Sequence, residues 1–287
     1  MLIVKSIILG IVQGLTEFIP ISSSAHLIIV PWLFGWTDPV LRSLTFDVSL
    51  HLGTLLALIV FFAADWVRLI GAWFKSISQF KIGLDPDRRL AWFIVVACIP
   101  GAIVGVLLEG KIEALFHPEG APLSTGAMIA MAVIIALLAL LLFLADRLAR
   151  HERPLGAMNW KDSTLIGLSQ ALAIFPGVSR SGSTITTGLA LGLQREAAAR
   201  FSFLLSAPII AGAGLKSLVD LFQSVKAGAI SGTELTRFPI GFVAAALSGF
   251  FCIKVLLRYL QKHTAAVFVY YRWALAVLIA IVALVRR

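Results

Sequence analysis

LSTGAMIAMAVIIALLALLLFLA, residues 123–145, is an apolar run without a charged side chain. It is long enough to cross a bilayer as an α-helix, for which about 20 residues suffice. Five further runs are similarly long and mostly apolar: 44–64, 90–109, 199–221, 238–259 and 266–285. None alternates apolar with polar residues as a membrane β-strand does. The sequence therefore predicts an all-α polytopic membrane protein with six transmembrane helices.

The composition of the chain supports a membrane protein. Of its 287 residues, 59% are hydrophobic and 14% are charged, with a mean hydropathy of +0.96, whereas soluble domains are about 45–50% apolar and roughly 25% charged. The net charge of +9 is carried by residues between the apolar runs. Basic residues at such positions indicate the orientation of the spans in the membrane, so we expect no nucleic-acid partner. Cys98 and Cys252 lie inside apolar runs and are expected in the core. Residues 1–12 lack the features of a cleavable signal and are expected to belong to the fold.

Two other segments, 2–36 and 163–193, are apolar but are interrupted by polar residues, prolines and glycines. Each is expected to form two short helices joined at a break, as a re-entrant helix–loop–helix segment. A backbone break at membrane depth is tolerated only where protein buries it or water solvates it. We therefore expect the functional residues at these two breaks.

The two interrupted segments resemble each other, and each precedes three full spans. This order predicts one integral membrane domain, 1–287, built as an inverted repeat of residues 1–146 and 160–287. With the N-terminus outside, the inner segments carry fourteen Lys and Arg residues and the outer segments seven. That bias agrees with the preference of positive residues for the cytoplasmic side.

The first break lies in QGLTEFIPISSSAH, residues 13–26. Gln13 and Glu17 are four residues apart and share a helical face. An ionisable residue in a membrane segment marks a functional site; this carboxylate could ligate a divalent cation or act as an acid or base. The serines beside His26 offer a hydroxyl nucleophile and a base. The alternative is a helix cap with a polar packing contact.

The second break lies in PGVSRSGST, residues 176–184. A Gly/Ser turn at a helix N-terminus presents free N–H groups to an anion, and Arg180 adds a planar fork of donors suited to phosphate. Placing Arg at this depth costs about 2.5–3.5 kcal/mol, so we expect an anionic partner. Glu17 and a bound phosphate are the two candidates. A purely structural Arg–Glu pair is the alternative.

Asp47 and His51 share a helical face near the outer end of the first full span. They could line the mouth of a site or form a polar contact between helices. Carboxylate, hydroxyl, imidazole and guanidinium groups that meet inside a membrane point to a phosphate ester or anhydride with an apolar tail. A metal would shield the phosphoryl charge, and arginine would stabilise the transition state.

At these two motifs the chain resembles the undecaprenyl-pyrophosphate phosphatase family, also called the bacitracin-resistance protein family. The family is marked by a Glu/Gln-x-x-x-Glu element, here Gln13–Glu17, and a Pro-Gly-x-Ser-Arg-Ser-x-x-Thr element, here Pro176–Thr184. The stretches 18–26 and 201–205 also match. The resemblance implies an enzyme of the bacterial inner (plasma) membrane with its active site facing the periplasm or outer side. It would convert undecaprenyl pyrophosphate to undecaprenyl phosphate, which recycles the carrier lipid for peptidoglycan synthesis and confers bacitracin resistance.

The resemblance also implies roles for individual residues. Glu17 becomes the essential acid and the metal contact, Ser23 the nucleophile or a phosphate ligand, His26 the base, and Arg180 the clamp on the pyrophosphate. Gln13 takes a place often held by a second Glu and cannot carry charge. Further substrate contacts would come from Ser22, Ser179, Ser181 and Thr184. Whether the reaction passes through a phosphoserine or uses water directly is left open by these residues.

The implied cofactor is a divalent cation, Mg²⁺ or Ca²⁺. The implied partners are a polyprenyl pyrophosphate and membrane lipids, and a homodimer is an assembly that the resemblance allows. A transporter or flippase of lipid phosphate or another anionic solute is the main alternative, because broken helices in inverted repeats are also typical of transporters. The Ser–His–Glu grouping favours hydrolysis, since transport needs no nucleophile. A type 2 phosphatidic acid phosphatase is less favoured, because its motifs do not occur in order.

Overall fold

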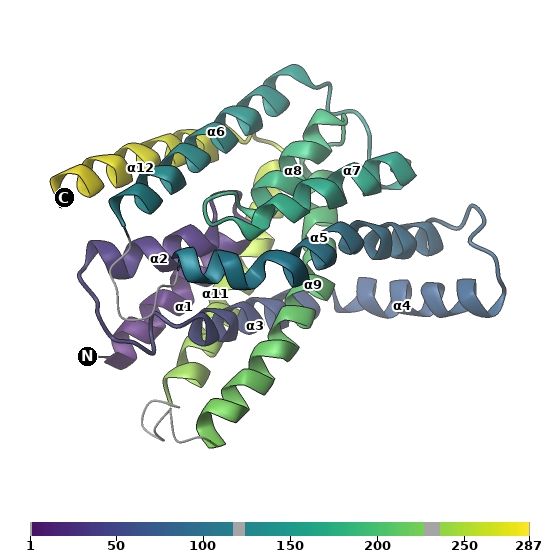
Figure 1. The fold of residues 1–287 in the computed structure, drawn as a ribbon. Helices are drawn as coiled ribbons and strands as arrows, with labels where there is room; N and C mark the ends of the chain where they lie inside the picture. The colour runs from purple at the N-terminus through teal and green to yellow at the C-terminus, as the bar shows by residue number, and fades with distance from the viewer. Residues whose placement is uncertain (1, 117–123, 227–235, 287) are drawn as a thin grey trace.

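The computed structural model of the chain describes residues 2–116, 124–226 and 236–286. Over these ranges the chain folds into helices joined by short loops (Figure 1). The α-helices are α1 (Leu2–Phe18), α2 (Ser23–Leu33), α3 (Leu44–Phe61), α4 (Ala63–Ser78), α5 (Pro86–Phe116), α6 (Thr125–Leu148), α7 (Trp160–Ala171), α8 (Arg180–Ala190), α9 (Arg195–Lys226), α11 (Arg237–Leu260) and α12 (Ala266–Val285).

The predicted spans are confirmed, with one change. Within the described ranges, five helices are long and apolar enough to cross a bilayer: α5, α6, α9, α11 and α12. The sixth candidate, the pair α3 and α4, is bent by 82°, so the run 44–64 is not one straight helix. The corner at Phe62 contains neither proline nor glycine; tertiary contacts hold it instead. The Phe62 side chain is buried, and Arg200 of α9 lies over its ring while binding Asp65 at 2.6 Å.

Both predicted breaks are present. In the first half the chain turns between α1 and α2, and in the second half it turns between α7 and α8. Each pair of short helices precedes long helices, and α6 and α12, which end the two halves, pack against each other (Figure 1). The element order therefore repeats. The limits of the two repeats, 1–146 and 160–287, stay a prediction.

The repeat is visible residue by residue around the breaks. Ser22 and Gly35, which flank α2, have positive φ angles of 74° and 62°. Ser179 and Gly192, which flank α8, have the same separation and positive φ angles of 69° and 83°. Both helices contain 11 residues. The two short helices therefore have the same length. Each is preceded by a serine with a positive φ angle and followed by a glycine with a positive φ angle.

Glycines allow the short helices to pack closely against long ones. A Cβ on Gly10 of α1 would lie 2.4 Å from the carbonyl oxygen of Gly241 on α11. At the corresponding place in the other half, a Cβ on Gly167 of α7 would lie 2.6 Å from the carbonyl oxygen of Ala97 on α5. Neither position admits a larger residue, because the obstructing atoms are backbone. The glycines thus fix the short helices against the centre of the molecule.

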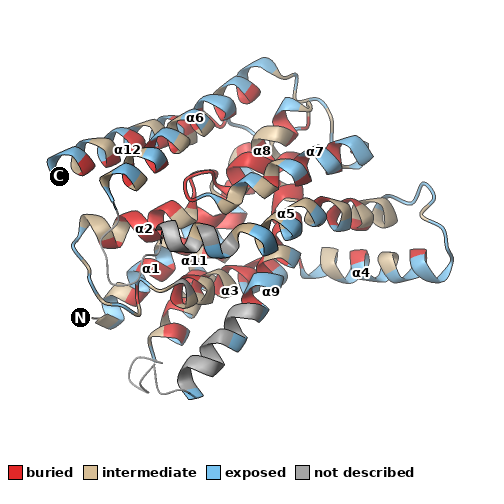
Figure 2. Ribbon diagram, viewed as in Figure 1, coloured by how far each residue is buried: buried red, intermediate tan, exposed pale blue. Residues whose placement is uncertain are grey.

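Buried residues concentrate where the two breaks meet, whereas the outer helices carry many exposed ones (Figure 2). Exposed positions on α6 and α12 are mostly apolar, including Val133, Leu137, Val277 and Ile281. Apolar side chains on the outside are expected where lipid replaces water. The breaks, by contrast, lie inside the protein, as the rule on backbone polarity at membrane depth requires.

Candidate active site

The two breaks end in the same backbone geometry. Ser22 is the N-cap of α2 and Ser179 is the N-cap of α8, both in the left-handed region. A non-glycine residue there costs about 1–3 kcal/mol and is found most often at functional sites. The Ser22 hydroxyl lies 3.4 Å from that of Ser24, and the Ser179 hydroxyl lies 3.3 Å from that of Ser181. Two equivalent strained turns therefore begin the two short helices.

These turns contact each other directly. The backbone N–H of Gly177 donates to the Ser22 hydroxyl at 3.2 Å, and the Ser181 hydroxyl donates to the carbonyl of Ile19 at 3.2 Å. The N-termini of α2 and α8 consequently lie close together. Each N-terminus carries unpaired N–H groups and the positive end of the helix dipole. Their convergence inside the protein favours a bound anion.

Glu17 is the acidic residue at this junction and is 5% exposed. One carboxylate oxygen, Oε1, binds the guanidinium of Arg180. The other, Oε2, accepts hydrogen bonds from the Ser23 hydroxyl at 2.6 Å and from the Gln13 amide at 2.9 Å. A buried carboxylate is stable only when paired and hydrogen-bonded in this way. The first and second motifs are thus joined through a single carboxylate.

Arg180 is the first residue of α8, and its side chain is only 14% exposed. Its Nη2 binds Glu17, while its Nη1 is buried without a hydrogen-bond partner among the described residues. Buried donors are rarely left unpaired. A phosphate oxygen would satisfy this donor, so Arg180 can hold Glu17 and a phosphate together. Both anionic partners expected for this arginine are compatible with the geometry.

Ser23 and His26, the predicted nucleophile and base, do not contact each other. The Nδ1 of His26 lies 2.6 Å from the carbonyl oxygen of Ser22, which can only accept, so Nδ1 carries the hydrogen. Its Nε2 lies 2.6 Å from the hydroxyl of Tyr271 on α12. Both ring nitrogens are therefore occupied, and the acceptor beside the Ser23 hydroxyl is Glu17 instead. The predicted role of His26 as the base would require it to exchange partners.

The other predicted substrate contacts mainly hold the turns together. The Ser22 hydroxyl accepts from Gly177, and the Ser179 hydroxyl caps α8 by accepting from Gly182 N–H at 3.0 Å. The Thr184 hydroxyl lies 2.7 Å from that of Ser202 on α9. Of the predicted set, the structure brings Gln13, Glu17, Ser23 and Arg180 into one constellation. Their roles stay predictions.

Arg272 of α12 is a component of the site that the motifs do not include. It is fully buried and donates to the carbonyls of Pro20 in the first break and Gly177 in the second, at 3.2 and 3.0 Å. A third bond, to Ile135 of α6, is 3.2 Å long. Arg272 thereby ties both breaks to α6 and α12. A charged residue in the middle of an apolar span is the signal that could have identified it.

His51 of α3 also reaches this constellation, through a polar contact between α3 and α1. Its Nε2 lies 3.4 Å from Glu17 Oε2, and its side chain is 25% exposed. Asp47, one turn earlier, is buried and holds the ring through its backbone carbonyl, 2.8 Å from Nδ1. His51 is therefore the partly exposed wall of the constellation around Glu17.

A metal would have few protein ligands here. Within the described part of the chain, no three His, Cys, Asp or Glu side chains are grouped closely enough to hold an ion. Glu17 is the predicted metal contact, and the Gln13 carbonyl oxygen Oε1 is a buried acceptor without a partner among the described atoms. An oxygen of this kind suits a hard cation. The residues thus fit an ion that is completed by substrate or water.

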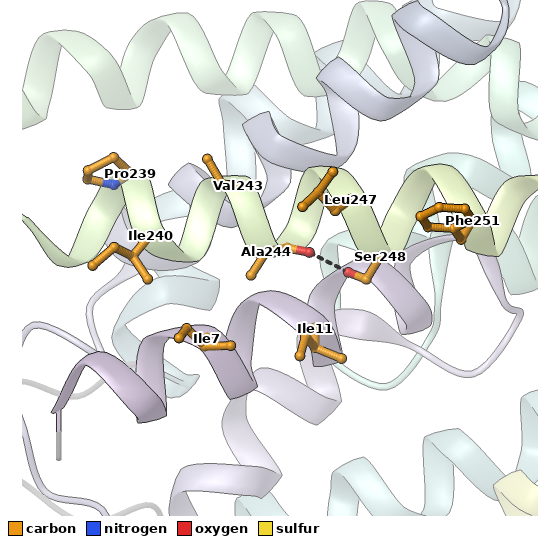
Figure 3. Close-up of a pocket in the computed structure, with 9 residues that line it drawn as sticks. All are labelled: Ile7, Ile11, Pro239, Ile240, Val243, Ala244, Leu247, Ser248 and Phe251. Atoms are coloured by element: carbon orange, nitrogen blue, oxygen red, sulfur yellow. Dashed lines mark hydrogen bonds between the residues drawn. The ribbon is translucent and has the colours of Figure 1, made fainter.

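An apolar groove on the surface is separate from this constellation (Figure 3). It runs between α1 and α11 and is lined by apolar side chains together with Ser248, whose hydroxyl donates to the Ala244 carbonyl at 2.6 Å. Ile7 and Ile11 line it from α1, on a face of the helix different from that of the buried Gln13 and Glu17. None of the residues that line the groove is charged, so it offers no cation to a phosphate.

Comparison with known proteins gives a consistent result. Residues 6–278 match the family described as bacitracin resistance protein BacA. Proteins named undecaprenyl-diphosphatase are 46% identical in Caldicellulosiruptor bescii, covering 96% of this chain and 95% of the relative, and 46% identical in Moorella thermoacetica, covering 100% of both. A third, from Thermomicrobium roseum, is 41% identical over 97% of each chain. This polytopic membrane protein therefore belongs to the bacitracin resistance protein BacA family.

Proposed function

We propose that this protein hydrolyses undecaprenyl diphosphate to undecaprenyl phosphate and inorganic phosphate, at the junction of its two breaks. The names of its relatives support this substrate. The observation that carries the proposal is the junction itself, where the Ser23 hydroxyl and the Arg180 guanidinium, from two distant motifs, both bind the Glu17 carboxylate. Such a set suits attack on phosphorus, and transport alone would need no nucleophile.

The anion is bound by positive groups from both halves. The N-termini of α2 and α8 supply partial positive charge, Arg180 supplies an unpaired buried donor, and Arg272 adds a buried cation behind the two turns. Glu17 is the carboxylate that contacts this set. Arg180 and Ser23 bind different oxygens of this carboxylate, so a phosphate held by Nη1 of Arg180 would lie close to groups of both breaks. Positive charge already in place stabilises the transition state without reorganisation.

Ser23 is the nucleophile that the geometry favours. Its hydroxyl hydrogen already points to Glu17 Oε2 at 2.6 Å. In the proposed first step, Ser23 Oγ bonds to the terminal phosphorus, its proton passes to Glu17, and the bond from phosphorus to the bridging oxygen breaks. Undecaprenyl phosphate leaves with that oxygen. Water then cleaves the phosphoserine, releasing inorganic phosphate, with Glu17 positioned to exchange the protons.

A divalent cation, Mg²⁺ or Ca²⁺, would be held at Glu17 and would neutralise charge on the phosphoryl oxygens. Gln13 offers a neutral oxygen and cannot replace a second carboxylate. The proposed location is the bacterial inner membrane with the site toward its outer side, which the bias of basic residues toward the opposite side supports. The homodimer stays a prediction.

The test is phosphate release from undecaprenyl diphosphate by the detergent-purified protein. We expect release that stops with a chelator and falls by at least about a thousandfold in Glu17→Ala, since its loss removes the proton acceptor and the metal contact together. Glu196→Ala, on the first turn of α9, is the matched control and should retain activity. Absence of release from well-folded wild-type protein would contradict hydrolysis, and lipid movement between vesicle leaflets would then be measured.

A further inference from the structure

The starting point is the tautomer of His51. Its Nδ1 lies 2.8 Å from the backbone carbonyl of Asp47. A carbonyl oxygen only accepts hydrogen bonds, so Nδ1 carries a hydrogen. In the neutral ring the lone pair is then on Nε2, and Nε2 faces Glu17 Oε2. Two acceptor atoms that face each other require a positive charge between them, either a proton on Nε2 or a bound metal cation.

The distance between these atoms indicates which kind of cation. An imidazolium hydrogen-bonded to a carboxylate lies at about 2.7–2.9 Å, whereas Nε2 and Oε2 are 3.4 Å apart. Two metal–ligand bonds of about 2.1 Å that open at a tetrahedral angle place their ligand atoms about 3.4 Å apart. The separation therefore matches two neighbouring ligands of one metal ion better than a direct ion pair.

A second observation comes from Gln13. Its side chain is fully buried and its Nε2 donates to the same Glu17 oxygen, but its Oε1 has no partner within the described part of the protein. Leaving a buried acceptor unpaired costs about 1–3 kcal/mol. A cation bound beside Glu17 would give this oxygen a ligand role.

We propose that His51 Nε2 and Glu17 Oε2 together bind the divalent cation, with the amide oxygen of Gln13 as a weaker third contact. This proposal rests on the proposed function only for the diphosphate oxygens that complete the coordination. The imidazole compensates for the carboxylate that is absent at position 13. It also changes the metal preference, because an imidazole nitrogen is a better ligand for transition metals, with Mn²⁺ the weakest of them, than for Ca²⁺, which is bound by oxygen.

The experiment measures Mn²⁺ alone, by electron paramagnetic resonance, on the detergent-purified full chain. We expect a ¹⁴N coupling on bound Mn²⁺ in the wild type, and its replacement by a ¹⁵N coupling in protein labelled with ¹⁵N-histidine. In His51→Gln the coupling should vanish and the dissociation constant should rise at least tenfold, since even outer-sphere changes weaken binding by about 10–100-fold. Competition should show Mn²⁺ displacing Ca²⁺ from the wild type but not from this variant.

His263→Gln is the matched control, because His263 is exposed and stacks on Tyr259 away from Glu17. It should keep both the coupling and the affinity. Mn²⁺ that binds the wild type without a nitrogen coupling, or no Mn²⁺ binding at all, would overturn the proposal; the wild-type spectrum decides this even if a variant fails to fold. The Mn²⁺ measurement contains no lipid substrate, so its result does not depend on phosphate release. A protein that binds Mn²⁺ through His51 but releases no phosphate would support this proposal and contradict the proposed function. Phosphate release without a nitrogen coupling would do the opposite.

Discussion

The two breaks have the same backbone geometry but carry different side chains. Ser22 and Ser179 occupy equivalent strained N-caps, yet the next residue is Ser23 in the first break and Arg180 in the second. Five residues before the cap, the first half has Glu17 and the second has Ile174. The first break thus supplies the hydroxyl and the carboxylate, and the second supplies the guanidinium of Arg180. A repeated scaffold brings two helix N-termini together, and divergence of single positions makes the site asymmetric.

The largest effect should come from the position at which the two breaks differ most. We expect Arg180→Ala to lower turnover by about 10³–10⁵-fold, because it removes the charge that stabilises the phosphoryl transition state. Arg180→Lys should recover only a small part, since an ammonium lacks the paired donors that reach Glu17 and phosphate together. Phosphate release measures both variants, and Arg258→Ala, at an exposed site on α11, is the control. Near-normal turnover in Arg180→Ala would show that Arg180 is not the clamp on the pyrophosphate.

Ser23 tests whether the first break supplies the nucleophile. If it does, Ser23→Ala should lower turnover by about 10²–10⁴-fold. Ser24→Ala changes a hydroxyl that contacts only Ser22 at 3.4 Å among the described groups and should have a mild effect. A burst of covalent ³²P label on the wild type, absent in Ser23→Ala, would support the phosphoserine. A mild loss in Ser23→Ala would instead indicate attack by water with Ser23 as a ligand.

The smallest effect concerns the two glutamines at equivalent positions. Gln13 donates to Glu17 at 2.9 Å, whereas Gln170 donates to the backbone of Ala97 at 3.4 Å. We expect Gln13→Ala to lower turnover by about 10–150-fold, which corresponds to about 1.5–3 kcal/mol for a hydrogen bond to a charged group. Gln170→Ala should change turnover by less than about threefold and should lower only thermal stability. Equal losses would show that the two breaks contribute alike, against the asymmetry described above.

Much of this arrangement was predictable because it depends on residues that are close together in the sequence. Apolar runs identified the spans, and the polar breaks identified where the residues of the two motifs meet, since lipid leaves few ways to satisfy the backbone. The separations of Gln13 and Glu17, and of the serines around Arg180, follow from short motifs. Arg272 gave a local signal, as a charge inside the span 266–285, but its partners could not be inferred. The bend at Phe62 gave no local signal.

The sequence by itself determined which segments are helices and which side chains lie at each break, because helix periodicity and apolar length are properties of neighbouring residues. Only the tertiary structure decided which groups meet. Glu17 contacts Arg180 and His51, and Arg272 binds the carbonyls of both breaks. These pairs join residues far apart in the chain, so they depend on how whole helices pack. Packing is set by shape and close approach over many residues, and no short motif encodes it.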